Sequence, residues 1–434
     1  MTRVPGRASG WTHERGLLRQ PPSPDRACRG EASDSSGLAA RHRPTIGLVP
    51  DFRSLPPAQG GIDVYSQALL AQLLPGESRY RFVVFIADRY RDRLPLLGEH
   101  VATVPVPAAA GGSLRSIWWY LTVLPRLARR CHVDLLHLLS GNRCLAPCPG
   151  AATLATVHDV HHHDSIRLYG PSSFIFFRSV LVPLLKRQDH IIAVSASTAR
   201  QVEERLGVPP ARITTVPNGI DRRRFRVLAS GEEARRVRAK YSLLGDFLLF
   251  VSSLEHPRKN HIGLVRAYRR LRETTSRVGD LVLVGGDGYG AAVIHRAIAR
   301  AGLAESVRVL GPIPGEDLVA LYNTAQAFVH PSTREGFGLP VLEAMACGLP
   351  VACSDIPAFR EVAGDAAVFF DPHDAASMAE AVLTVCRDGG VRDECRARGL
   401  ARAELFSWES TARRVTEVYD QLLCARLGSV SSGS

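Results

Sequence analysis

The sequence predicts an α/β protein made of two doubly wound, Rossmann-like domains. The chain has 434 residues, which is enough for two domains with cores of ordinary size. Short apolar runs alternate with helix-like stretches from about residue 44 to residue 425, as in parallel sheets covered by helices. Several of these runs end in loops with glycine, and such sheets bind ligands outside the carboxyl ends of their strands.

The composition is that of an ordinary globular protein, with 45% hydrophobic and 22% charged residues. No apolar run reaches the length of about 18 residues that a membrane-spanning helix needs. The nine cysteines are scattered, and no two close pairs have the spacing of a zinc site. Because no secretory signal is evident, we expect a cytoplasmic protein whose cysteines are reduced and mostly buried.

Residues 1–43 differ from the rest of the chain. They contain eight Arg against four acidic residues and many Pro, Gly and Ser, and they supply part of the formal net charge of +12. The segment has little periodicity and no apolar stretch of the kind found in secretory signals. We therefore expect it to be disordered, with an Arg-rich transit peptide or an over-extended gene start as alternatives.

The first domain is expected over residues 44–221. It begins with an apolar strand at Thr45–Pro50, a loop that ends in Gly60-Gly61, and a helix over Ile62–Leu74. A glycine loop between a strand and a helix is either a phosphate cradle or a structural turn, and two glycines do not decide between them. Six more strands are expected, at Phe82–Ala87, Val101–Val106, Val133–Leu139, Leu154–Val157, Ile191–Val194 and Ile213–Val216.

His158 follows one of these strands directly, at the edge where ligands bind. A run of three histidines at residues 161–163 comes soon after it. Histidine-rich segments can hold metal ions, but no partner ligands occur elsewhere at a recognisable spacing. We therefore expect no metal site here and treat residues 161–163 as loop residues.

Two segments combine aromatic and basic residues without any acid: residues 114–130, with Trp118 and Trp119, and residues 171–187, with Phe174. Such helices can dock on an anionic membrane surface. The alternative is that the aromatic side chains belong to the core and the basic ones to a solvated face. Nucleic acid is not an expected partner, because no recognised binding motif accompanies these residues.

The second domain is expected over residues 222–407, after a charged linker at 222–245. A strand at Phe247–Val251 leads into a loop with Arg258 and Lys259, at the start of a helix from about Asn260 to Glu273. Two cations at this place can neutralise a diphosphate, although a surface charge pair is the alternative. Further strands are expected at Leu281–Val284, Val307–Leu310, Ala327–Val329, Leu349–Cys353 and Ala367–Phe370, and helices at Pro357–Val362, 374–387, 391–405 and 408–425.

The loop after Ala327–Val329 has the richest pattern. Glu335 precedes Gly336 and Gly338, which would leave backbone N–H groups exposed where a helix begins. Pro340 suits the first helical position, and Gly348 suits the residue just past the helix end. The pattern predicts strand, ligand-binding loop, short helix and strand.

A second carboxylate, Glu343, lies about one turn into this helix among apolar neighbours. A buried carboxylate needs a partner, and a vicinal diol such as a ribose could be one. On its own, Glu343 could equally lie on a solvated helix face, and the two glycines could form a plain turn.

Glu335 and Glu343, separated by seven residues, give this stretch its resemblance to the retaining glycosyltransferases of the group 1, family 4 type. Residues 156–159, 193–198 and 215–221 also resemble that family. The resemblance implies the GT-B fold, in which the two domains face each other across a cleft. It also implies that the last helix, 408–425, crosses back to the first domain, and we expect residues 426–434 to be disordered.

The resemblance implies transfer of a hexose from a nucleotide-diphosphate sugar with retained anomeric configuration. It assigns catalytic or donor-contacting roles to His158, Arg258, Lys259 and Glu335. It places the donor against the loops of both domains, at Gly60, Gly61, Asn218, Ile313, Gly336, Phe337, Gly338 and Glu343. Mannose is the first candidate for the sugar, because the loop at 257–260 resembles that of mannosyltransferases, and the acceptor is expected to be a glycan or a lipid-linked glycan.

One residue departs from the family's pattern. Ser253 stands where many members have an arginine shortly after the strand, and Arg258 is the residue that could supply the missing charge. A non-catalytic sugar-nucleotide-binding protein and a sugar-nucleotide epimerase therefore remain alternatives. No Asp-x-Asp motif suggests a metal, and no carboxylate nucleophile is evident in the first domain, so we expect no cofactor and same-face attack of the acceptor.

Overall fold

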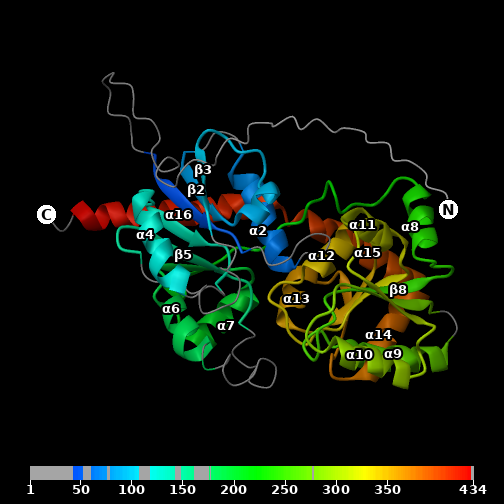
Figure 1. The fold of residues 1–434 in the computed structure, drawn as a ribbon. Coiled ribbons are helices and arrows are strands. Elements are labelled where there is room, and N and C mark those ends of the chain that lie inside the picture. Colours follow the sequence, from blue (N-terminus) through cyan, green and yellow to red (C-terminus); the bar gives the residue numbers. More distant parts are fainter. Residues whose placement is uncertain are drawn as a thin grey trace, which may run out of the picture.

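The computed structural model describes residues 43–51, 60–75, 79–106, 118–141, 148–160, 175, 177–275 and 278–431. Two parallel sheets lie next to each other, with helices around both (Figure 1). Their strand orders are β3-β2-β1-β4-β5-β6-β7 and β10-β9-β8-β11-β12-β13. The chain winds outward from the middle of each sheet in both directions, so the predicted fold of two doubly wound α/β units is confirmed.

In its described residues, the first half of the molecule contains seven strands and the helices around them. The strands are β1 (Thr45–Val49), β2 (Arg81–Ile86), β3 (Val101–Pro105), β4 (Leu135–Leu138), β5 (Ala152–Val157), β6 (His190–Ala193) and β7 (Ile213–Thr215). The helices are α2 (Gly61–Leu73), η1 (Asp88–Arg93), η3 (Trp119–Val123), α4 (Leu124–Arg130), η5 (Phe177–Leu181), α6 (Val182–Lys186), α7 (Ala196–Leu206) and η6 (Pro210–Arg212). The order reverses between β1 and β4, so the loops after β1, β4 and β5 meet at one edge.

The second half is built on the same plan. Its strands are β8 (Phe247–Val251), β9 (Asp280–Val284), β10 (Val307–Gly311), β11 (Ala327–His330), β12 (Val351–Ser354) and β13 (Ala367–Phe370). Its helices are α8 (Glu232–Lys240), α9 (His261–Thr274), α10 (Ala291–Arg300), α11 (Gly315–Thr324), α12 (Leu339–Ala346), α13 (Pro357–Ala363), α14 (Ala375–Arg387) and α15 (Gly389–Glu404). Here the strand order reverses between β8 and β11, and this place is the topological switch point of the sheet. The loop with Lys259 and the loop with Glu335 lie on its two sides.

The last helix, α16 (Trp408–Ser431), leaves the second half and packs on α2, β4 and β5 of the first, as predicted (Figure 1). Tyr419 anchors it: this side chain is fully buried, and its hydroxyl lies 2.7 Å from Nδ1 of His137 in β4. The helix continues to Ser431, beyond the expected end at residue 425, so the expectation of disorder does not hold for residues 426–431.

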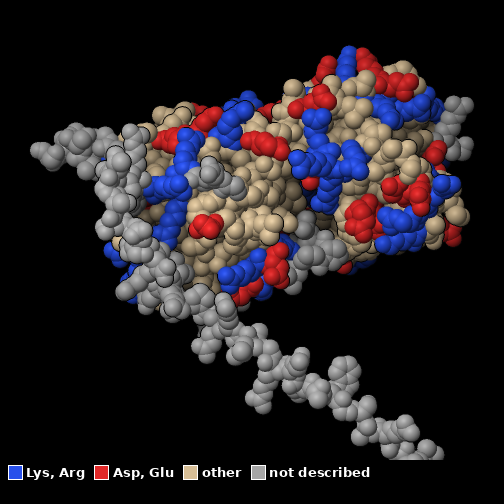
Figure 2. All heavy atoms as spheres, turned by 90° about the horizontal axis from the view of Figure 1, so that it is seen from above, with Lys and Arg blue, Asp and Glu red and all other residues tan. Residues whose placement is uncertain are grey.

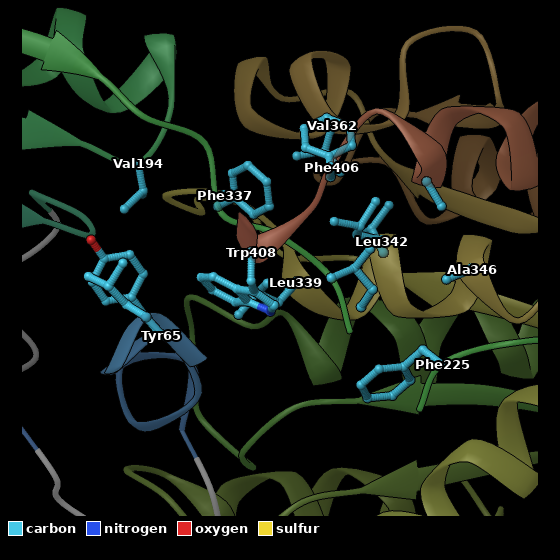
Figure 3. Close-up of a cluster of buried hydrophobic side chains, with 14 of the residues drawn as sticks. Tyr65, Val194, Phe225, Phe337, Leu339, Leu342, Ala346, Val362, Phe406 and Trp408 are labelled. Carbon is cyan, nitrogen blue, oxygen red and sulfur yellow. The ribbon is translucent and has the colours of Figure 1, made fainter. Parts of the chain in front are cut away.

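An apolar cluster continues from one half of the molecule into the other (Figure 3). It brings Tyr65 of α2 and Val194 after β6 together with Phe337 of the loop before α12 and with Trp408 at the start of α16. Tyr65 and Trp408 meet edge to face, with ring centroids 5.9 Å apart. Burial of this kind is the main favourable term in association, so the two halves are held together by more than the connecting chain.

The cysteine prediction is wrong for Cys131. Cys131, which follows α4, is disulfide-bonded, whereas all nine cysteines were expected to be reduced. The expectation rested on the spacing of the cysteines and on the absence of an evident secretory signal. Neither feature shows whether two thiols lie close together in the folded protein, so nothing in the sequence indicated this bond. The other cysteines in the described part of the chain are free, namely Cys148, Cys347, Cys353, Cys386, Cys395 and Cys424.

Charge is distributed in patches over both halves. In the view of Figure 2, groups of Lys and Arg alternate with groups of Asp and Glu instead of forming one continuous basic face. Among the described residues, no helix is long and apolar enough to span a membrane.

Candidate active site

The loop between β11 and α12 forms the centre of the site. Gly338 precedes α12 with φ of +115°, a conformation that L side chains rarely adopt, and a Cβ there would lie 2.8 Å from Cε1 of Phe359. Pro340 lies in the first turn of α12, as its missing N–H predicts. The side chain of Phe337 turns into the apolar cluster and meets Phe406 (Figure 3). The loop is therefore fixed on both sides of its glycines.

Glu335 is surrounded by positive charge. Its Oε1 lies 2.6 Å from Nζ of Lys259, and its Oε2 lies 3.6 Å from Nη1 of Arg258. Nε2 of His330, the last residue of β11, is 3.4 Å from Oε1. Burial alone would raise the pKa of this carboxyl group, but Lys259, His330 and Arg258 hold the pKa of Glu335 well below its usual range. Glu335 is therefore a carboxylate at any physiological pH.

Arg258 is oriented by a second carboxylate. Its Nε and Nη2 donate to the two oxygens of Glu255 at 2.8 and 2.7 Å, the two-pronged geometry that a guanidinium and a carboxylate favour. Burial alone would lower the pKa of Arg258, but Glu255, Glu335 and Asp159 raise it. Because Glu255 occupies one edge of the guanidinium, the remaining nitrogen, Nη1, is the one that faces Glu335.

Glu343 is buried in α12, with 8% of its surface exposed. Burial raises the pKa of this carboxyl group, while a hydrogen bond from Tyr322 and the charge of Arg224 act in the opposite direction. The Tyr322 hydroxyl donates to Oε2 at 2.9 Å. The sequence predicts that Glu343, if buried, needs a partner, and Tyr322 of α11 is that partner in this structure.

His158 lies on the other side of the site, directly after β5. Its Nε2 donates to the carbonyl of Leu139 at 2.8 Å, and the ring of Tyr65 meets it edge to face at 4.7 Å. The carbonyl oxygen of His158 would lie 1.7 Å from a Cβ at position 336, so only glycine fits there. The structure therefore brings His158 into direct contact with the loop that carries Glu335.

The remaining predicted residues lie at the edges of this site. Gly60 is the N-cap of α2, and a Cβ on Gly61 would lie 3.9 Å from Leu339 at the start of α12. Ile313 is buried in the loop between β10 and α11. Asn218 is buried where the chain crosses between the halves, and its Oδ1 has no partner among the described residues.

Several residues next to the site carried no assignment from the sequence. Glu255, His330 and Tyr322 contact the predicted residues directly, and Ser195 and Thr198 lie within hydrogen-bonding distance of the Gly336 carbonyl. Three of these had a signal in the sequence: His330 ends an apolar strand, and Ser195 and Thr198 belong to the stretch 193–198 that resembles the family. Nothing in the sequence distinguishes Glu255 or Tyr322 from other polar residues on their elements.

No cluster of three or more His, Cys, Asp or Glu that could hold a metal ion occurs in the described residues. The three histidines at residues 161–163 lie outside the described part of the chain. The positive charge of the site is supplied by Arg258 and Lys259.

Two family descriptions match the chain. Residues 59–224 match Glycosyltransferase Family 4, and residues 238–402 match Glycosyl transferases group 1. O-antigen chain mannosyltransferase B of Escherichia coli is 33% identical over 270 residues, which cover 62% of this chain and 70% of that protein. The chain belongs to the group 1, family 4 glycosyltransferases. The serotype-specific mannosyltransferase WbdA of Escherichia coli is 32% identical over 278 residues, but these cover only 34% of its length.

Solved structures show the same fold. Sucrose-phosphate synthase from Thermosynechococcus elongatus matches 88% of this chain and all of its own, with a TM-score of 0.68 and 22% identity. HepE from Anabaena, in complex with UDP and glucose, matches 87% of this chain and 99% of its own, with a TM-score of 0.67 and 19% identity. The predicted GT-B architecture of this glycosyltransferase is thereby confirmed.

Proposed function

We propose that this glycosyltransferase moves a hexose, with mannose as the first candidate, from a nucleotide-diphosphate sugar to a glycan or lipid-linked acceptor. The configuration at the anomeric carbon is retained. One observation carries the proposal: Arg258 and Lys259 converge on the buried Glu335, beside a loop whose glycines leave backbone N–H groups at a helix start. This combination suits a ligand that joins a sugar to a diphosphate.

The donor contacts divide between charge and hydroxyl groups. Arg258 and Lys259 stabilise the diphosphate as its negative charge grows during departure, which is where a fixed positive charge lowers the barrier most. Glu335 and the N–H groups of Gly336 and Phe337 hold hydroxyl and phosphate oxygens of the donor. His158, reaching in from the other half, orients the transferred sugar.

The nucleoside part of the donor lies beyond the phosphates. Glu343 accepts hydrogen bonds from the ribose hydroxyls, and the buried position of this carboxylate makes each of them strong. The base lies against the loop with Ile313, whose backbone groups contact it. HepE, with UDP in a protein of the same fold, supports a nucleotide sugar as the donor class. The mannosyltransferase relatives support mannose.

Retention is proposed to proceed by attack from the face that the diphosphate leaves. The departing phosphate oxygen accepts the proton of the acceptor hydroxyl, the new glycosidic bond forms, and the bond to the diphosphate breaks. The cations at 258 and 259 supply the charge stabilisation, so we propose that turnover needs no divalent metal. Trapping of a covalent glycosyl–enzyme, or loss of activity in EDTA with recovery in Mg²⁺, would contradict these two points.

A peripheral membrane contact is part of the proposal. Trp118 and Ile175 are each 61% exposed, and the segments that follow them pack together through Leu181 and Leu121. The exposed bases around them are Arg126, Arg129, Arg130, Arg178, Lys186 and Arg187. Exposed apolar side chains among bases and without acids fit the interface of an anionic bilayer. Trp119 and Tyr120 are buried, so part of the aromatic group belongs to the core.

The first test is the shift in melting temperature with GDP, UDP and ADP, for this protein and for Glu343→Ala. A nucleotide at a hundred times its dissociation constant stabilises the fold by about 2.7 kcal/mol, which is measurable. We expect a shift with one nucleotide and none with the variant. Incubation with the matching nucleotide sugar and glycan acceptors then identifies the product and its anomeric configuration by NMR. The absence of any shift would contradict the donor site and favour a non-catalytic role.

A further inference from the structure

We propose that Ser195 and Thr198, at the start of α7 in the first half, are positioning residues that complete the donor loop of the second half. This inference rests on the proposed function, because it assigns the Gly336–Phe337 peptide to the donor. The hydroxyl groups belong to the first half and the loop belongs to the second half. The contact between them therefore depends on how the two halves pack together.

The contact is short and buried. Oγ of Ser195 lies 2.5 Å from the carbonyl oxygen of Gly336, and Oγ1 of Thr198 lies 3.1 Å from the same oxygen. Both side chains are fully buried. A buried hydroxyl that loses its partner is costly, so these two groups favour the arrangement in which the loop carbonyl is present.

Holding the carbonyl group of Gly336 also fixes the direction of the N–H group of Phe337. The peptide between Gly336 and Phe337 is planar, and in the trans form its C=O and N–H point in opposite directions. When two hydroxyls hold the carbonyl toward α7, the N–H of Phe337 is held away from α7. No hydrogen-bond acceptor for that N–H occurs among the described residues. Ser195 and Thr198 therefore set the direction of the Phe337 N–H group, which can donate a hydrogen bond to the ligand.

A second contact joins the start of α7 to the second half, at α13. The carboxylate of Glu361, in α13 of the second half, accepts from the N–H groups of Ala196 at 2.8 Å and Ser197 at 3.2 Å. These are the first residues of α7, where a helix has free N–H groups and favours negative charge. Arg402 donates to the carbonyls at the end of α13 and holds that helix in place. In both contacts the first half supplies the hydrogen-bond donors and the second half supplies the acceptors.

The fit at Gly336 explains why the contact is so close. A Cβ at this position would lie 1.7 Å from the carbonyl oxygen of His158, so the backbones of the two halves touch here. The loop before α12 therefore contacts both the hydroxyl groups of α7 and the backbone of His158 at Gly336. If the halves moved apart, the N–H group of Phe337 would no longer be held in its direction. His158 would move away from the sugar at the same time.

The test uses Thr198→Val, which keeps the shape of the side chain and removes only its hydroxyl. We expect kcat to fall about tenfold, the size of one well-placed hydrogen bond. The dissociation constant of the nucleoside diphosphate should change less than about twofold, because other residues of the second half hold the nucleotide. Thr198→Ser should restore kcat. Ser197→Ala, on the same helix but without contact to Gly336, is the matched control and should keep wild-type kcat.

A measurement independent of turnover separates this inference from the proposed function. Hydrogen exchange of a peptide covering residues 335–342 should be faster in Thr198→Val and in Glu361→Gln than in wild type and Ser197→Ala, with all four proteins folded by melting temperature. Unchanged exchange together with unchanged kcat would overturn the inference. A wild type that binds nucleotide and never transfers sugar, with the exchange difference still present, would contradict the proposed function alone.

Discussion

Nζ of Lys259 lies 2.6 Å from Oε1 of Glu335, and both side chains are nearly buried. The carboxylate that we propose contacts the donor thus acts as the counterion of the cation that we propose contacts the diphosphate. We predict that Lys259→Met destabilises the protein by about 3 kcal/mol at pH 7, because it leaves a buried carboxylate with less positive charge. Urea unfolding of wild type and variant at pH 7 measures the difference.

The pH dependence of this loss has a defined sign. The pKa of Glu335 is depressed in the folded protein, so its contribution to stability is present above its unfolded pKa, about 4.3, and is lost as the pH falls. The difference between wild type and Lys259→Met should therefore shrink below about pH 4. The double variant Lys259→Met/Glu335→Gln is the control and should recover most of the lost stability at pH 7. A loss that persists in the double variant would mean that packing, not charge, causes it.

Glu343 should show the opposite behaviour. Burial raises the pKa of this carboxyl group, so ionisation of Glu343 costs the folded protein free energy as the pH rises through that pKa. We predict that Glu343→Gln abolishes the nucleotide-induced shift in melting temperature yet leaves the free protein equally or more stable at pH 8. Melting curves from pH 5 to pH 8, with and without nucleotide, test both parts.

Tyr322→Phe is the matched control for this prediction. It keeps the ring and removes the hydroxyl that donates to Glu343 at 2.9 Å. Because that hydrogen bond lowers the pKa of Glu343, its loss should raise the pKa further and weaken nucleotide binding at low pH first. A Glu343→Gln variant that still binds nucleotide would contradict the role of the carboxylate in ribose binding.

The sequence predicted the fold and several of the side chains that meet at the candidate site, because both depend on local patterns. Parallel strands alternate with helices along the chain, and Glu335, Glu343 and the glycines between them lie within a few residues of one another. Lys259 and Glu335 lie 76 positions apart, yet the switch-point rule already places their loops at one edge of one sheet.

What the sequence did not predict depends on contacts between distant elements. Ser195 meets Gly336 only because the two halves touch, and no local pattern encodes how they pack. Glu255 and Tyr322 act through the direction of their side chains, which periodicity does not fix. The disulfide at Cys131 was missed for the same reason, because residue spacing alone does not give the distance between two sulfur atoms.

The buried histidine in β4 makes the fold sensitive to acid. His137 is fully buried between Tyr419 and Thr156, and burial lowers its pKa to about 3. Between its folded and unfolded pKa values the unfolded chain binds more protons, so stability falls as the pH decreases below about 6.5. We predict that His137→Gln reduces this slope by up to about 1.4 kcal/mol per pH unit, measured by urea unfolding from pH 6.5 to pH 4.5.

His190 serves as the comparison. It lies in β6, is only partly buried, and burial lowers its pKa by less. The slope should therefore change less in His190→Gln than in His137→Gln. Equal slopes in wild type and His137→Gln would show that His137 is already protonated, or freed from its partners, before the protein unfolds.

The exposed side chains of Trp118 and Arg126 lie in the surface for which we propose a membrane contact. We predict that the protein sediments with vesicles of phosphatidylglycerol and not with vesicles of phosphatidylcholine. Each basic residue near an anionic surface contributes about 1 kcal/mol, so Arg126→Glu/Arg130→Glu should weaken binding by more than tenfold. Trp118→Ser should weaken it without changing its dependence on salt, because it removes apolar area and no charge.

The matched control for charge is Arg296→Glu/Arg300→Glu, on the exposed face of α10 in the other half of the molecule. It changes the net charge by the same amount at a place far from the proposed surface. Equal weakening by both double variants would mean that the vesicles sense only the overall charge of the protein, and the assignment of a membrane-facing surface would be wrong. Weakening by the first pair alone would support the proposed contact of this surface with an anionic bilayer.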